Sequence, residues 1–153
     1  MIDDLYSTNL LKLAANLPRV GRLAAPDASV EKIAKLCGSR VVVDVVVEDG
    51  RVADFAQDVK ACALGQAAAS VLGAHVIGAS LEELEVTGRQ FRAMLKDGAP
   101  APDGRFSDLA MLAPVKDYPA RHASTLLAFE AVTEAVRTAT ATATGRTSPA
   151  GAA

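Results

Sequence analysis

The chain has few of the features that mark the more specialised classes of protein. Its 153 residues include two cysteines and no tryptophan, and aromatic residues make up 4%. Neither charge sign dominates, because 16 Lys and Arg stand against 18 Asp and Glu. Proteins that follow a phosphate backbone need clustered positive charge, so the sequence predicts no nucleic-acid partner.

Long hydrophobic runs are also missing. No stretch approaches the roughly 20 apolar residues that span a bilayer, and Met1-Ile2-Asp3-Asp4 is acidic where a secretory leader would be basic. We therefore expect a cytoplasmic protein without a membrane partner. Half of the residues are hydrophobic, enough for one core and one domain. In a reducing compartment, two cysteines are more often reactive, metal-binding or buried than joined in a disulfide.

The residues between the two cysteines predict a β-hairpin. Val41 to Val47 is a nearly unbroken β-branched run, Asp49-Gly50 is a strong turn signal, and Arg51 to Val59 is a second extended segment. Pairing outward from this turn sets Cys37 opposite Cys62. Directly opposed residues have Cβ atoms roughly 4.5–5.5 Å apart, close enough for two thiols to bind one metal ion or cluster. A single bulge would shift this register.

Helix signals lie on both sides of the hairpin. The predicted helices cover about residues 4–15, with Asp3 or Asp4 as the cap, 61–76, 81–96 and 119–138. Cys62 falls at the start of the second helix, where backbone N–H groups and the helix dipole favour a thiolate. His75 is 13 residues further on, about 20 Å along a helix, so we exclude it from a site at Cys62.

The remaining segments are less regular. Residues 18–36 predict an irregular arm with at most one helical turn around Val30 to Leu36, and residues 97–107 predict a loop. In the last helix Leu126, Phe129, Val132 and Val136 recur at helical spacing, and His122 lies one turn earlier on that face. We expect one domain over residues 3–138, followed by a disordered tail over 139–153, where apolar bulk is low.

Several short segments follow one another in an order that resembles the NifU/IscU-type iron-sulfur cluster assembly scaffolds. They are Asn16-Leu17-Pro18-Arg19-Val20-Gly21, Cys37-Gly38, Asp49-Gly50, Lys60-Ala61-Cys62-Ala63 and Pro114-Val115-Lys116. The resemblance covers roughly residues 3–138. It implies a small α+β fold, in which an antiparallel sheet of about three strands packs against several helices.

The resemblance also implies a site for a transient iron-sulfur cluster or a zinc ion, held by three cysteines and an aspartate. Cys37 and Cys62 match two of the cysteine positions. Ser39 stands where the aspartate is usual, and Ala123 stands where the third cysteine is expected. Because histidine also binds iron and zinc, Cys37, Cys62 and His122 form a candidate ligand set with one open position.

Each candidate residue also has an ordinary structural role open to it. Free cysteines are often buried in cores, and a histidine at a helix start can cap or pack there. Lys60, opposite Ser39 in the predicted register, could lower the pKa of the thiols or simply face water.

Three classes of function follow from these residues. The leading hypothesis is a non-enzymatic scaffold on which iron meets sulfur from a cysteine desulfurase at Cys37 and Cys62, before the cluster passes to acceptor apoproteins. A homodimer would pool four thiolates around one cluster. The second is a zinc-binding or desulfurase-binding interaction module of the same fold, favoured by the losses at Ser39 and Ala123. An enzyme with Cys62 as nucleophile and His122 as base ranks last, because no third group orients the pair.

Overall fold

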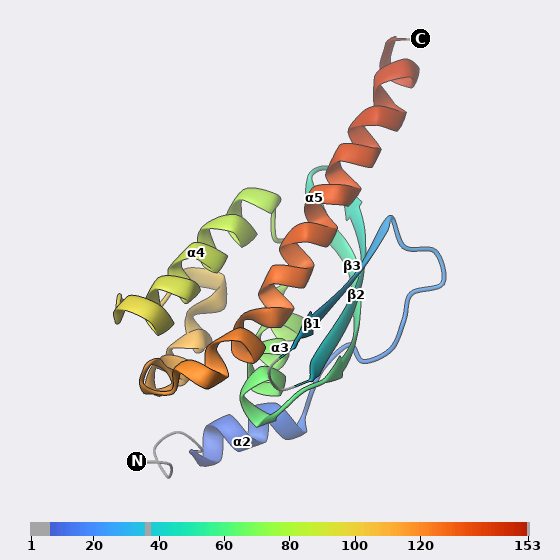
Figure 1. The fold of residues 1–153 in the computed structure, drawn as a ribbon. Helices are drawn as coiled ribbons and strands as arrows, with labels where there is room; N and C mark the ends of the chain where they lie inside the picture. Colours follow the sequence, from blue (N-terminus) through green and yellow to red (C-terminus); the bar gives the residue numbers. More distant parts are fainter. Residues whose placement is uncertain (1–6, 36–37, 153) are drawn as a thin grey trace.

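A three-stranded antiparallel sheet forms the middle of the fold, and the large helices cover one of its faces (Figure 1). The computed structural model describes residues 7–35 and 38–152, with side chains as far as residue 142. The strands, in spatial order, are β1 (Ala28–Ala34), β2 (Ser39–Glu48) and β3 (Arg51–Lys60). The predicted α+β fold with about three antiparallel strands is confirmed.

Four helices and two 3-10 segments complete the part of the chain that the structure describes. They are α2 (Thr8–Ala15), α3 (Ala63–His75), α4 (Leu81–Asp97), η1 (Gly104–Asp117), η2 (Pro119–Arg121) and α5 (His122–Ala152). Helix α5 runs across the sheet and also packs against α3 and α4 (Figure 1). The ring of Phe129 in α5 meets Phe91 of α4 and Phe106 of η1 edge to face, with centroids 5.5 and 5.3 Å apart. None of the helices that the structure describes combines the length and hydropathy needed to cross a bilayer.

The helix starts follow local capping signals. Ser80 caps α4 by accepting a hydrogen bond from the Glu83 amide at 3.1 Å, which confirms the predicted start of this helix, whereas the Glu83 carboxylate accepts from Arg105 at 3.0 Å. Ser7 caps α2 in the same way, accepting from the Leu10 amide at 3.2 Å. The expected cap at Asp3 or Asp4 lies outside the described residues.

The β2–β3 hairpin turns where the sequence predicts, but its register shifts by one residue. Asp49 and Gly50 have φ values of 53° and 75°, the left-handed pair of a type I′ turn. A bulge between Val46 and Val47 then moves the pairing, so that Arg40 faces Lys60. The predicted register is therefore wrong beyond the bulge. Lys60 faces Arg40 rather than Ser39.

Strand β1 replaces the irregular arm that we expected over its residues. It pairs with β2 in unbroken antiparallel register, from Ala28 opposite Val45 to Ala34 opposite Ser39. The expected helical turn around residue 30 is therefore wrong. The apolar alternation is interrupted by Lys32, which lies on the helix-facing side and reaches Glu134 of α5 with its ammonium at 2.9 Å. An ion pair thus occupies a position where the strand pattern calls for an apolar residue.

In the segment between α4 and α5, every third residue is apolar and packs into the core. Phe106, Leu109, Leu112 and Val115 are all buried, and three residues per turn is the period of a 3-10 helix. The expected apolar face of the last helix, at Leu126, Phe129, Val132 and Val136, is also buried. Helix α5 is described beyond the predicted boundary at residue 138, and Ala139 is buried on it. The division into a domain over 3–138 and a disordered tail over 139–153 stays a prediction.

The outer edge of β3 is occupied by the chain itself. The Gln57 amide donates to the Arg19 carbonyl at 3.0 Å, and the Gly21 amide donates to the Gln57 carbonyl at 2.9 Å. Further along, the Val52 amide donates to the Ala79 carbonyl at 2.9 Å. The backbone around residues 19–21 and the backbone at Ala79 therefore both hydrogen-bond to the same edge of the sheet.

The face of the sheet away from the helices carries a buried carboxylate, Asp44, whose side chain has 0% exposure. Arg22 binds it in a bidentate pair at 2.7 and 2.9 Å, and the Leu23 amide and the Ser29 hydroxyl donate to it at 2.9 and 2.6 Å. Burial alone would raise the pKa of Asp44, but these donors outweigh it and hold the pKa below its usual value. Asp44 thereby ties the N-terminal arm and β1 to the central strand.

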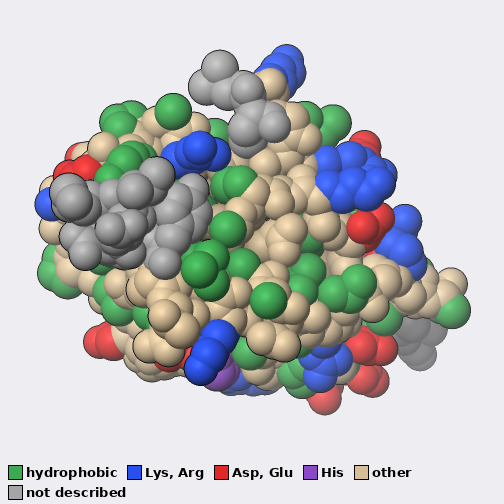
Figure 2. Space-filling view, turned by 90° about the horizontal axis from the view of Figure 1, so that it is seen from below, with side chains coloured by type: hydrophobic (Ala, Val, Ile, Leu, Met, Phe, Trp, Pro, Cys, Tyr) green, Lys and Arg blue, Asp and Glu red, His purple; other side chains and the backbone are tan. Residues whose placement is uncertain are grey.

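Charges of both signs are mixed over the surface. Seen from the end of the molecule that carries α2, Lys and Arg lie near Asp and Glu around the margin, and hydrophobic side chains are scattered over the middle (Figure 2). This mixture agrees with the formal net charge of −2.

We expect Asp44→Asn to lower the free energy of unfolding at pH 7 by about 2–4 kcal/mol, because a buried ion pair and its hydrogen bonds are lost. Since the folded pKa lies below the unfolded one, this stabilisation is present above about pH 4 and is lost as the pH falls through the folded pKa. Urea titrations of both proteins between pH 7 and pH 2.5 should show the difference narrowing in acid. Asp58→Asn is the control, because its ion pair with Arg40 is long, at 3.9 Å, and exposed. An equal loss in both variants would contradict this account.

Candidate functional site

A hollow of about 540 Å³ lies where β3 ends and α3 begins. Its lining consists of Gly38, Ser39, Val59, Lys60, Ala61, Cys62, Gln66 and Arg121. These residues come from the β1–β2 turn, from the end of β3, from the start of α3 and from η2. The lining contains one thiol and two cations, and it includes no carboxylate. A thiolate or another anion is therefore favoured here.

Cys62 occupies the position expected from the sequence, at the N-terminus of a helix. It is the N-cap residue of α3, with an extended backbone, and it is half-buried. The amides of Leu64 and Gly65 lower the pKa of its thiol, although neither forms a cap hydrogen bond of standard geometry. These are the free N–H groups that every helix start leaves without an intrahelical partner.

Ser124 brings a second helix into the site. This residue in the first turn of α5 is buried, and its Oγ lies 3.4 Å from the Sγ of Cys62. The same hydroxyl can donate to the Arg121 carbonyl at 3.3 Å. A neutral Cys62 can thus donate to Ser124 while Ser124 donates to Arg121. After Cys62 loses its proton, the serine hydroxyl can rotate to donate to the thiolate.

Opposing effects decide the acidity of Cys62. Burial is the largest effect and would raise the pKa of the thiol. The Ser124 hydroxyl, the two α3 amides and the positive charge of Arg121 act the other way, and together they bring the pKa below its usual value. A lower pKa increases the thiolate fraction near neutral pH, and the thiolate is the nucleophile and the metal ligand.

A glycine allows this approach of α3 to α5. A Cβ placed on Gly65 would lie 3.0 Å from the Ser124 carbonyl oxygen and 2.9 Å from the Ala61 Cβ. Real Cβ atoms rarely come so close to backbone atoms, so any larger residue would push the two helix starts apart. The contact between Cys62 and Ser124 thus depends on Gly65.

His122 lies near this region, but it is not among the residues that line the hollow. Its side chain is buried, and Nε2 lies 2.9 Å from the Val115 carbonyl oxygen and 3.3 Å from that of Lys116. Because a carbonyl only accepts, Nε2 carries a proton and Nδ1 is the nitrogen left for a ligand. A ligand role for His122 stays a prediction.

Cys37 lies outside the described residues, so its predicted meeting with Cys62 stays a prediction. Its neighbours Gly38 and Ser39 line the same hollow as Cys62. Continued beyond the last pair, the observed register would set position 38, not 37, across from Cys62. Over the part of the chain that the structure describes, no three His, Cys, Asp or Glu side chains are grouped so that they could hold a metal ion.

The sequence did not predict Ser124, Arg121 and Gln66 as members of the site. Ser124 lies 62 residues from Cys62 and follows Ala123, which is exposed. Its only signal in the sequence is its place in the first turn of the last helix, beside the position where the family resemblance expects a cysteine. The resemblance could therefore have led to Ser124, whereas helical periodicity alone could not.

A three-stranded antiparallel sheet packed against helices, with Cys62 at the start of the helix that follows the last strand, is the arrangement that the resemblance to NifU/IscU-type scaffolds implies. The family model of the NifU-like N terminal domain matches residues 5–125. The chain therefore belongs to this family. Scaffolds of the family hold iron-sulfur clusters transiently, work with a cysteine desulfurase and are in general not enzymes.

Individual relatives agree with this assignment. The iron-sulfur cluster assembly scaffold protein IscU of Thermotoga maritima is 29% identical over 135 residues, which cover 87% of this chain and 93% of that protein. The crystal structure of a nitrogen-fixing NifU-like protein (N-terminal) from Brucella abortus has a TM-score of 0.89 at 51% identity and covers 90% of this chain and 96% of its own. A putative scaffold protein for the SUF system from Fervidobacterium islandicum shares the fold, with a TM-score of 0.80 at 19% identity and coverage of 88% and 98%.

We expect Ser124→Ala to raise the pKa of Cys62, because the variant removes a hydrogen-bond donor to the thiolate. The measurement is the rate of iodoacetamide alkylation against pH, in a Cys37→Ser background so that only Cys62 reacts. The alkylation midpoint should move to higher pH, and the rate at pH 7 should fall. Thr125→Val is the matched control, because its hydroxyl bonds the Arg121 carbonyl at 2.7 Å. Equal shifts in both variants would show that Ser124 does not act on the thiolate directly.

Gly65→Ala and Gly88→Ala should affect stability in opposite directions. At Gly65 the new methyl group meets the α5 backbone, and we expect a loss of about 1–3 kcal/mol in the free energy of unfolding. At Gly88 of α4 a Cβ would meet nothing within 4 Å, so alanine should stabilise the protein by about 0.5–1 kcal/mol. Urea unfolding followed by circular dichroism measures both. If Gly65→Ala were more stable than wild type, the starts of α3 and α5 would have room for a methyl group between them, which would contradict this account.

Proposed function

We propose that this protein is a non-enzymatic scaffold that binds iron and sulfide, or a nascent cluster, at Cys37 and Cys62, and then passes the cluster to acceptor apoproteins. The observation that carries the proposal is the low-pKa thiol of Cys62 in a hollow lined by two cations. Membership of the NifU-like family supports it. Work with free thiolates requires a reducing compartment, and we propose the cytoplasm.

The chemistry of the hollow suits the uptake of sulfur. In the proposed first step the Cys62 thiolate attacks the outer sulfur of a persulfide on a cysteine desulfurase. A new S–S bond forms at Cys62, the old S–S bond breaks, and the desulfurase thiolate leaves. The thiolate fraction of Cys62 sets the rate of this attack, and Ser124 and the α3 amides raise that fraction.

The positive charge of the hollow is complementary to the negative charge of an iron-sulfur cluster. Thiolate-ligated iron-sulfur clusters carry net negative charge, and the charge around a cluster tunes its properties. Lys60 and Arg121 line the hollow and offset that charge. Since the sequence has two cysteines, a homodimer that joins two hollows would supply the four thiolates of a [2Fe–2S] cluster.

His122 is the third member of the proposed ligand set. Metal-binding histidines usually donate their other ring N–H to a carbonyl or carboxylate, which fixes the ring and the tautomer. Nε2 of His122 contacts the Val115 carbonyl in this way, at 2.9 Å, and leaves Nδ1 for iron. For Nδ1 of His122 to reach an iron ion held at Cys62, the start of α5 would have to move towards the hollow.

The second candidate function is a zinc-binding or desulfurase-binding interaction module of the same fold, without cluster assembly. The observation that favours it is the change of two usual ligand positions, to Ser39 and Ala123. Metal analysis of untagged protein separates the two functions. Stoichiometric zinc, together with failure to take up iron and sulfide, would favour the interaction module.

We expect anaerobic reconstitution with ferrous iron and sulfide to give a visible absorption band and about one [2Fe–2S] cluster per dimer. Cys62→Ser and Cys37→Ser should abolish the band, because each removes a thiolate ligand. Ser70→Ala, a buried hydroxyl change elsewhere on α3, is the control and should retain it. If instead one chain holds the cluster with His122 as the third ligand, His122→Ala should make the cluster less stable to chelators, whereas His75→Ala should not.

The same experiment can refute the proposal. If wild type and both cysteine variants stay equally colourless, or if all three take up iron and sulfide equally, Cys37 and Cys62 do not form the site. Sedimentation of the reconstituted protein tests the dimer. A cluster carried by a monomer would contradict the pooling of four thiolates.

A further inference from the structure

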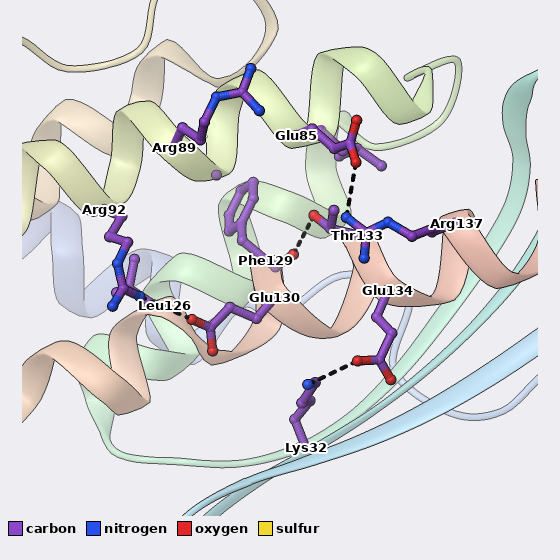
Figure 3. Close-up of a pocket in the computed structure, with 12 residues that line it drawn as sticks. Lys32, Glu85, Arg89, Arg92, Leu126, Phe129, Glu130, Thr133, Glu134 and Arg137 are labelled. Atoms are coloured by element: carbon purple, nitrogen blue, oxygen red, sulfur yellow. Dashed lines mark hydrogen bonds and ion pairs between the residues drawn. The ribbon is translucent and has the colours of Figure 1, made fainter.

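A second concave site lies between α4 and α5, formed by residues other than those of the cysteine hollow. It is a groove of about 470 Å³ (Figure 3), and the large apolar side chains of its lining are those of Leu84, Leu126 and Phe129, all three of them buried. Its rim is charged. Glu85 pairs with Arg137 and Arg92 pairs with Glu130, so the two helices that border the groove run antiparallel.

The charges of the rim do not cancel. Each of its three carboxylates already has a cation, since the third, Glu134, pairs with Lys32 at 2.9 Å. A fourth cation, Arg89, lines the groove and has no ion pair among the described residues. Figure 3 shows its guanidinium standing apart from the three pairs. The groove therefore carries one positive charge in excess, in a chain whose formal net charge is −2.

Gly88 lies in the middle of α4 and lines the same groove. Glycine weakens a helix interior, and it is usually kept where a backbone must approach another group closely. Within this chain no such group exists at Gly88, because a Cβ placed there would meet nothing within 4 Å. Gly65 and Gly73, by contrast, have backbone or side-chain atoms at 3.1 Å or less from such a Cβ. The space over Gly88 is therefore open to a group that approaches from outside the chain.

We propose that this groove binds an amphipathic helix of a partner protein, with a small side chain over Gly88 and a carboxylate against Arg89. On α5 the lining runs from Leu126 to Arg137, about 16 Å at 1.5 Å per residue. This length matches about three turns of a bound helix, and a helix in a groove is a common mode of recognition. The carboxylate of the partner helix supplies the negative charge that pairs with Arg89. Its small side chain fits the space that Gly88 leaves.

The groove shares no lining residue with the hollow at Cys62. Helix binding here therefore does not rest on the proposed cluster assembly, and either can fail without the other.

Selection of peptides by mRNA display tests this inference. The probe is a library of randomised 16-residue helical peptides, and the bait is the full-length wild-type chain. Enriched peptides should carry Asp or Glu at one fixed position, and Gly, Ala or Ser three or four residues away. Gly88→Leu fills the groove and Arg89→Glu reverses its free charge, and each should weaken binding at least about tenfold. Exchange of the acidic residue of the peptide for Lys should restore binding to Arg89→Glu.

Two controls keep the result specific. Lys96→Glu changes an exposed cation of α4 outside the groove and should leave affinity unchanged. Thermal unfolding should show that Gly88→Leu is folded, since its Cβ meets no atom of the chain. The inference is overturned if no peptide is enriched, if enriched peptides are basic, or if the groove variants bind as well as wild type. It is also overturned if wild type is a dimer that Gly88→Leu dissociates, because a second copy then covers the groove.

Discussion

The starts of α3 and α5 lie against each other because Gly65 has no side chain, and the chemistry of the cysteine hollow depends on that contact. It sets the Ser124 hydroxyl 3.4 Å from the Cys62 sulfur and holds Arg121 at the rim of the same hollow. Residues that are distant in the sequence thereby act on one thiol. Further along α5, the edge-to-face contacts of Phe129 with Phe91 of α4 and Phe106 of η1 hold the helix in place. The position of a single serine hydroxyl is thus fixed by the packing of most of the domain.

Two acidic side chains, the buried Asp44 and the half-buried Cys62, follow the same physical rule. Burial would raise the pKa of each, and hydrogen-bond donors and nearby positive charge outweigh burial and lower it in both cases. The outcome differs because the surroundings differ. Asp44 has 0% side-chain exposure and a complete set of donors, so its charge is used to hold the arm in place. Cys62 is only half-buried beside an open hollow, so its thiol remains accessible from outside the chain.

Local signals in the sequence predict local structure well in this protein. The Asp49-Gly50 turn, the Ser80 cap of α4 and the place of Cys62 at a helix start each depend on a few adjacent residues. The predictions that are wrong depend on interactions between residues that are distant in the sequence. Lys32 interrupts the alternation of β1 because its partner is Glu134, about a hundred residues away. The bulge after Val46 has no glycine or proline to mark it, and it moves every pair beyond it by one residue. The third strand was predicted by the family resemblance and not by its own pattern.

The occupied edge of β3 limits how this protein can assemble with itself. Exposed strand edges invite strand addition from another chain, and proteins commonly block them with their own segments. Here the backbone at Arg19 and Gly21 takes up the hydrogen bonds of Gln57, and Ala79 takes up the amide of Val52. A second copy cannot extend the sheet at these points without first displacing them. At this edge of the sheet, self-association that brings two hollows together must therefore proceed through side chains around the hollow, where the approaching surfaces also decide which molecules can reach the sulfur.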